Sequence, residues 1–172
     1  MPPEIFIDDF ERTENSDLLH GVIGRSLIIA TRFDSMCTAL SMALEVKAGA
    51  LYLLNSDEGF KQFVTQAESK YRTLNSSIKS FGMPDKISEI LHQARKSRNE
   101  VAHSLTKGLE GCIDTKISND DLLNKASALI GNIVNGDIII SILVSTFNND
   151  PILNNTSLEK YKSKVINWVI NP

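Results

Sequence analysis

The sequence contains few of the residues that bind metal ions or carry out redox chemistry. It contains two cysteines, Cys37 and Cys112, and three histidines, His20, His92 and His103, in 172 residues. The cysteines lack metal-ligand spacing, and no histidine pair has the HExxH spacing of zinc proteases. Gly-rich phosphate loops, paired catalytic carboxylates and serine-nucleophile motifs are also absent. We therefore expect no metal and no cofactor, and the common metalloenzymes and nucleotide hydrolases are disfavoured.

A charged-then-apolar leader and a long apolar run are missing as well. The first charged residues are acidic, and the longest apolar run, "DIIISILVSTF" at 137–147, is too short to span a bilayer. This pattern and the few cysteines favour a protein of the reducing cytoplasm without a membrane partner. The formal net charge is -3, so any contact with RNA must use a local basic patch.

The composition that remains is that of an ordinary globular domain. Hydrophobic residues make up 42% and charged residues 23% of the chain, which is enough for one domain with a core. Residues 1–15 contain two prolines and five acidic side chains, and they predict a flexible acidic arm. We expect residues 16–172 to form a single helical domain.

Apolar residues recur every three or four positions, which predicts helices. The first helix is expected to begin at an N-cap within 15–17 and to reach Gly49. The second is expected from 55 or 56 to Phe81, and the third from about Asp85 to Lys107, where Gly108 follows.

A fourth helix, capped by Ser118 or Asn119, is expected to continue through the 137–147 run. Three isoleucines at 138–140 have strand propensity, but no second alternating segment is present to pair with them. A last helix is expected after a cap at Thr156 or Ser157. The fold predicted is thus all-α, an antiparallel bundle of four to five helices.

The predicted inward faces include one residue that is costly to bury. Phe60, Ile90 and Trp168 continue the apolar stripes of the second, third and last helices, and Arg98 lies on the stripe of the third. A guanidinium on an inward face needs a carboxylate, a phosphate or the rim of an interface. Arg98 is therefore expected to have a partner.

Positive charge is concentrated on the same helix. Arg95, Asn99, His103 and Lys107 follow one another at steps of four and share one face, and Lys96 and Arg98 flank this row. Between residues 95 and 107, four fixed positive charges stand against one negative charge, so this segment is basic within an acidic chain.

The stretch "RNEVAH", residues 98–103, resembles the Arg-polar-x-x-x-His motif of the HEPN (higher eukaryotes and prokaryotes nucleotide-binding) superfamily. It has four residues between Arg98 and His103 and the preferred polar residue, Asn99, after the arginine. The resemblance implies a helical dimer in which two such motifs meet at a two-fold axis. Leu105 stands where members regulated by a partner nucleotidyltransferase have Tyr, so regulation by adenylylation is not expected here.

The same resemblance implies a metal-independent endoribonuclease of a toxin-antitoxin or antiphage defence system, with an antitoxin or regulatory protein as partner. His103 would be general acid and base, Arg98 would hold the scissile phosphate, and Asn99 would orient either group. We expect Arg95, Lys96 and Lys107 to contact RNA.

Two other hypotheses remain open. In the first, the chain is a non-catalytic HEPN-like module that binds a nucleotide, RNA or protein as a regulator does, in the manner of mannitol-repressor-like proteins. In the second, Arg98 and His103 only stabilise assembly. For Arg95, Lys96 and Lys107, a solvated helix face is the alternative to RNA contact.

Overall fold

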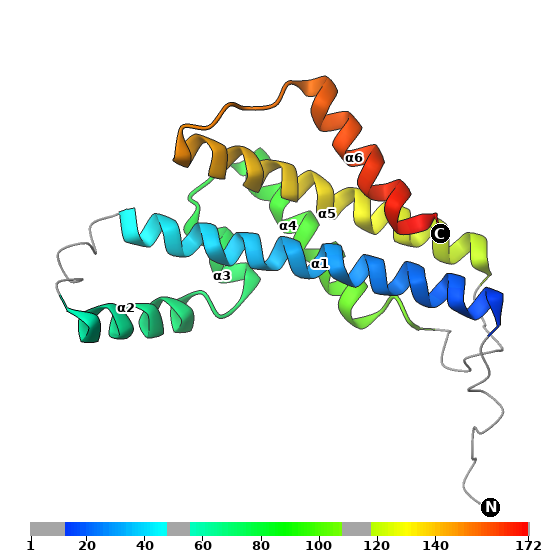
Figure 1. Ribbon diagram of the computed structural model, residues 1–172, viewed down its shortest axis with the longest axis horizontal. Coiled ribbons are helices and arrows are strands. Elements are labelled where there is room, and N and C mark those ends of the chain that lie inside the picture. The colour runs from blue at the N-terminus through cyan, green and yellow to red at the C-terminus, as the bar shows by residue number, and fades with distance from the viewer. Residues whose placement is uncertain (1–12, 48–55, 108–117, 172) are drawn as a thin grey trace, which may run out of the picture.

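The computed structural model describes residues 13–47, 56–107 and 118–171, and these residues form six α-helices and no strand (Figure 1). The all-α prediction is confirmed. The predicted arm lies outside the described residues up to residue 12, but Glu14 and Asn15 are helical, so the helical region begins earlier than expected. The helices are α1 (Glu14–Lys47), α2 (Asp57–Lys70), α3 (Leu74–Ser80), α4 (Asp85–His103), α5 (Asn119–Asn148) and α6 (Asn155–Ile170).

Helix α5 lies at the centre of the packing and contacts α4, α1 and α6 (Figure 1). Helices α4 and α6 run in the opposite direction to α5 (Figure 1). Helix α1 runs parallel to α5 and packs directly against it, which the antiparallel prediction missed. Asn15 and Asn119 hydrogen-bond where both helices begin, and the Lys47 ammonium lies 4.5 Å from the Phe147 ring centre where both end. The chain returns between them through α2, α3 and α4.

A glycine permits the closest helix approach in the core. A Cβ at Gly136 of α5 would lie 2.6 Å from Cβ of Ala94 on α4 and 2.9 Å from Cε2 of Phe33 on α1. Both distances are shorter than any normal carbon contact. Gly136 permits this approach because the three helices meet at the place where it has no side chain.

The predicted second helix is two helices. Thr73 adopts an extended conformation, and its hydroxyl accepts a hydrogen bond from the Ser76 amide while the Ser76 hydroxyl accepts one from the Thr73 amide. This reciprocal cap starts α3 afresh. Tyr71, Arg72 and Thr73 therefore form a bend where continuous periodicity predicted one helix.

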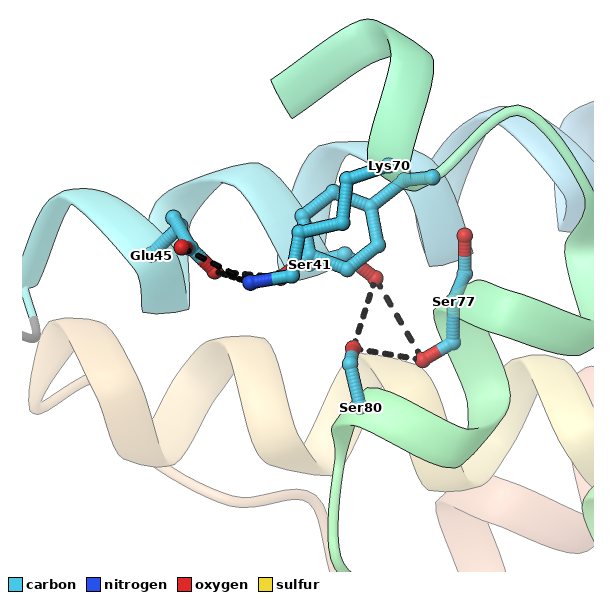
Figure 2. Close-up of polar contacts among 6 residues, drawn as sticks. Ser41, Glu45, Lys70, Ser77 and Ser80 are labelled. Atoms are coloured by element: carbon cyan, nitrogen blue, oxygen red, sulfur yellow. Dashed lines mark hydrogen bonds and ion pairs between the residues drawn. The ribbon is translucent and has the colours of Figure 1, made fainter. Parts of the chain in front are cut away.

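Polar contacts attach α2 and α3 to α1 (Figure 2). Lys70 Nζ donates to both carboxylate oxygens of Glu45, at 2.8 and 2.7 Å, and the Tyr71 hydroxyl also donates to Glu45. The hydrogen bonds from Lys70 and then Tyr71 lower the pKa of Glu45. Ser41 Oγ donates to the Ser77 carbonyl at 3.4 Å on the α3 side. Only Ala67 of α2 is buried, so α2 is held chiefly at its C-terminal end.

Several expected boundaries and faces differ from the structure. The cap of α5 at Ser118 is confirmed, whereas Asn154, not Thr156 or Ser157, caps α6. For α1, the Ser16 amide donates to the Thr13 hydroxyl, so the cap precedes the predicted 15–17. Three apolar side chains expected to face inward are exposed: Phe60 (51%), Ile90 (41%) and Trp168 (47%).

Two helices, α1 and α5, are long and apolar enough to cross a membrane by length and composition. Central helices of soluble bundles have the same character. Each also carries charged groups in its middle: Asp137 is buried within α5, and Arg32 and Asp34 lie within α1.

Candidate functional site

Arg98 has the partner that its position called for. Its side chain is 26% exposed, and Nη2 donates to the Oδ2 of Asp34, which comes from α1 and is itself 28% exposed. Nη1 of Arg98 also donates to the Asn99 Oδ1 at 3.2 Å. A carboxylate from another helix thus satisfies the guanidinium at the edge of the core.

Arg98 opens onto a hollow of about 280 Å³ between α1, α3 and α4, which we call the arginine hollow. Among the residues that the structure describes, three guanidinium groups and a single carboxylate line it. Its walls are Asp34 of α1, Arg72 and Thr73 of the bend before α3, Leu74 and Asn75 at the start of α3, and Arg95, Arg98 and Asn99 of α4. Arg72 was not among the predicted site residues, because nothing in the sequence places the bend beside α4.

Arg95 contributes a donor that protein groups leave unsatisfied. Its Nε is buried and has no hydrogen-bond partner among the residues described. One turn earlier, burial and then the charges of Arg95, Lys79 and Lys96 lower the pKa of His92. The neutral form of His92 is therefore favoured beside these cations.

His103 is separate from the hollow. It is the last residue of α4, it is exposed, and its imidazole makes no hydrogen bond or ion pair with any part of the chain that the structure describes. The helix ends there because Ser104 leaves helical geometry, with φ -136° and ψ -11°. The helix therefore stops before Lys107, where the sequence predicted its end.

The predicted site residues consequently divide into two groups. Arg95, Arg98 and Asn99 meet in the arginine hollow. Lys96 is exposed on α4 outside it, and Lys107 lies in the turn beyond the helix. The expected row at steps of four is correct as far as His103, but Lys107 does not continue it.

A second polar cluster lies in the core, away from the hollow. Asp137 is 2% exposed, accepts a hydrogen bond from the Tyr161 hydroxyl of α6, and lies 3.6 Å from Arg32 Nε. Burial and then this hydrogen bond raise the pKa of Tyr161 to about 12. Burial, with nearby carboxylates, raises the pKa of the Cys37 thiol. This cluster ties α1, α5 and α6 together and does not open onto the site.

Within residues 13–47, 56–107 and 118–171, no group of three or more His, Cys, Asp or Glu side chains is placed to hold a metal ion. Cys112 lies outside these ranges. Planar guanidinium groups bind the oxygens of phosphate and carboxylate through paired hydrogen bonds. The arrangement is therefore suited to binding an oxyanion.

Comparison with protein-family models, with curated proteins and with solved structures found no match to this chain. The function of this chain must consequently be inferred from its own residues and their arrangement.

Proposed function

We propose that the chain is a metal-independent endoribonuclease of the HEPN type, acting in the cytoplasm in a toxin-antitoxin or antiphage defence setting. One observation carries the proposal: α4 presents Arg98 and Asn99 to a cationic hollow and, five residues after Arg98, an exposed histidine whose imidazole has no partner among the described residues. Phosphate-binding cations and an accessible imidazole are the groups that cleavage of RNA without a metal requires.

In the proposed reaction, His103 removes the proton from a ribose 2′-hydroxyl, and the 2′-oxygen attacks the adjacent phosphorus. The bond to the 5′-oxygen of the next nucleotide breaks, and that oxygen takes up a proton from an imidazolium. The products are a 2′,3′-cyclic phosphate and a 5′-hydroxyl. Arg98 holds the negative charge that develops on the phosphate oxygens, and Asn99 orients the phosphate or His103.

The geometry favours two copies of the chain over one. Along an ideal helix, Arg98 and His103 are separated by about 7.5 Å and about 140° around the axis. A general base must come within hydrogen-bond reach of the hydroxyl that it deprotonates. A homodimer with α4 near its two-fold axis would place His103 of one copy beside Arg98 of the other. Lys96, Lys107 and Arg95 would then contact the flanking RNA.

A non-catalytic regulatory module is the second candidate, and the Asp34 carboxylate favours it. Asp34 already occupies Arg98, and His103 is outside the arginine hollow. A protein of this kind would bind RNA, a nucleotide or an antitoxin-like partner protein and would not cleave. Under the endoribonuclease proposal, the incoming phosphate displaces Asp34 from Arg98.

Cleavage of total RNA and of tRNA in excess EDTA tests the proposal, with fragment ends identified by mass spectrometry. The His103→Ala protein should lose about 100-fold or more of the activity, the usual contribution of a general acid or base. His20→Ala is the matched control, because His20 is also exposed and lies on α1. No cleavage by the wild type over a range of concentrations would favour the regulatory module.

A further inference from the structure

The arginine hollow carries more positive charge than one phosphodiester requires. Arg72, from the bend between α2 and α3, lines it together with Arg95 and Arg98 of α4, and Asp34 is the single carboxylate that the described ranges contribute to its lining. Three guanidinium charges and one carboxylate charge leave an excess of two positive charges. A phosphodiester of the RNA backbone carries one negative charge, whereas a terminal phosphate carries about 1.5 to 2 at neutral pH.

We infer that the arginine hollow binds the terminal phosphate of an RNA strand, with Arg72 as a phosphate-binding residue and Asp34 as the internal carboxylate that the phosphate replaces. The inference rests on the proposed function in taking RNA as the ligand. It adds a preference for phosphorylated ends, which a nuclease acting only on internal bonds does not need.

The size and lining of the hollow support recognition of a phosphate and not of bases. At about 280 Å³ it lies at the lower end of ligand sites, which range over roughly 300–1,000 Å³. None of the described residues that line it is aromatic, so these residues offer bases no stacking surface. The polar groups are guanidinium, amide and hydroxyl donors, which suit phosphate oxygens.

An unsatisfied donor points to the same kind of ligand. Nε of Arg95 is buried without a partner within the described ranges, although the residue lines the hollow. A buried donor of this kind is costly unless an acceptor reaches it. A phosphate has three acceptor oxygens and satisfies more such donors than the two oxygens of Asp34.

When no ligand is bound, Asp34 is the ion-pair partner of Arg98. Its Oδ2 accepts from Arg98 Nη2, and both side chains are partly open to solvent. Since the pair is not enclosed, exchange of the carboxylate for a more highly charged phosphate does not require the core to open. Asp34 therefore competes with the ligand and weakens binding.

Fluorescence anisotropy with a 2′-O-methyl oligonucleotide, which cannot be cleaved by 2′-oxygen attack, tests the inference. Three versions carry a 5′-phosphate, a 3′-phosphate or hydroxyl groups at both ends. One of the two phosphorylated ends should bind about tenfold more tightly than the hydroxyl ends. This gain in affinity is modest for two charge-assisted hydrogen bonds. The Arg72→Ala protein should lose this preference. Lys79→Ala removes an exposed cation of α3 outside the hollow and should retain it.

Two further variants keep the result interpretable. Asp34→Asn should bind the phosphorylated end more tightly than the wild type, and Arg72→Lys should retain part of the preference. Equal binding of all three oligonucleotides, an unchanged preference in Arg72→Ala, or competition by inorganic phosphate as strong as by the phosphorylated strand would each overturn the inference. Cleavage of hydroxyl-ended RNA by the wild type, lost in His103→Ala, would leave the endoribonuclease standing in those cases.

Discussion

Replacing Gly136 by alanine should destabilise the protein, although alanine is the better helix former. The new Cβ would lie 2.6 Å from Cβ of Ala94 and 2.9 and 3.1 Å from two ring atoms of Phe33. Carbon atoms normally approach to about 3.5–4.0 Å, so α4 or the Phe33 ring must retreat by roughly 1 Å. Neither neighbour is the free end of a flexible chain, since Ala94 and Phe33 are both fully buried.

The magnitude follows from two opposing contributions. Overpacking a core typically costs about 1–3 kcal/mol, or more where backbone must move. Replacement of glycine by alanine within a helix returns up to about 1 kcal/mol. We expect a net loss of roughly 1–2 kcal/mol in the free energy of unfolding, which lowers the Tm by about 2–8 °C in a chain of this length.

Gly131→Ala is the matched control in the same helix. Its new Cβ would meet only Cδ1 of Ile166, at an ordinary 3.8 Å, so this variant should be as stable as the wild type or more stable by up to about 1 kcal/mol. Urea denaturation followed by circular dichroism measures both variants. If Gly136→Ala proved as stable as Gly131→Ala, the close approach of α1, α4 and α5 would be refuted.

The core cluster and the buried thiol provide two more predictions. Because the pKa of Tyr161 is raised from 10.0 to about 12, the folded protein holds this proton longer than the unfolded chain, and stability should fall as the pH rises from 10.0 to about 12. Absorbance of phenolate against pH should show a step near 12 that Tyr161→Phe lacks; if Tyr161→Phe instead removed a step near 10, burial of Tyr161 beside Asp137 would be refuted. In a Cys112→Ser background, Cys37 should react with a thiol reagent at the rate of global unfolding, because it is buried and its pKa is raised. Rapid labelling of the folded protein would contradict that placement.

Local patterns predicted most of the helices because helices depend on residues close in sequence. The α5 cap at Ser118 and the continuation of α5 through 137–147 followed from capping and periodicity. The need of Arg98 for a partner followed from its place on the inward stripe. That partner, Asp34, is 64 residues away in sequence, and no local pattern identifies a contact of that separation.

What the sequence did not predict depends on how helices meet. The bend at Thr73 interrupts a periodic apolar pattern, and it brings Arg72 to the hollow. The parallel contact of α1 with α5 follows from the path of the chain between them. Gly136 lets α1 and α4 approach α5 closely, and the helix propensity of glycine gives no sign of this contact. His103 lies outside the hollow although it belongs to α4, because it is about 140° around the helix axis from Arg98. Lys107 leaves the row because α4 ends a few residues before the glycine that marked its expected end.

The attachment of α2 has a consequence for local stability. This helix buries only Ala67 and is fastened to α1 chiefly through Glu45, so it can open at a fraction of the free energy of global unfolding. Arg72 follows α2 directly, and each opening would carry one guanidinium away from the hollow. A ligand that needs Arg72 would bind the closed form alone, and its binding would slow the exchange of the α2 amide hydrogens with solvent.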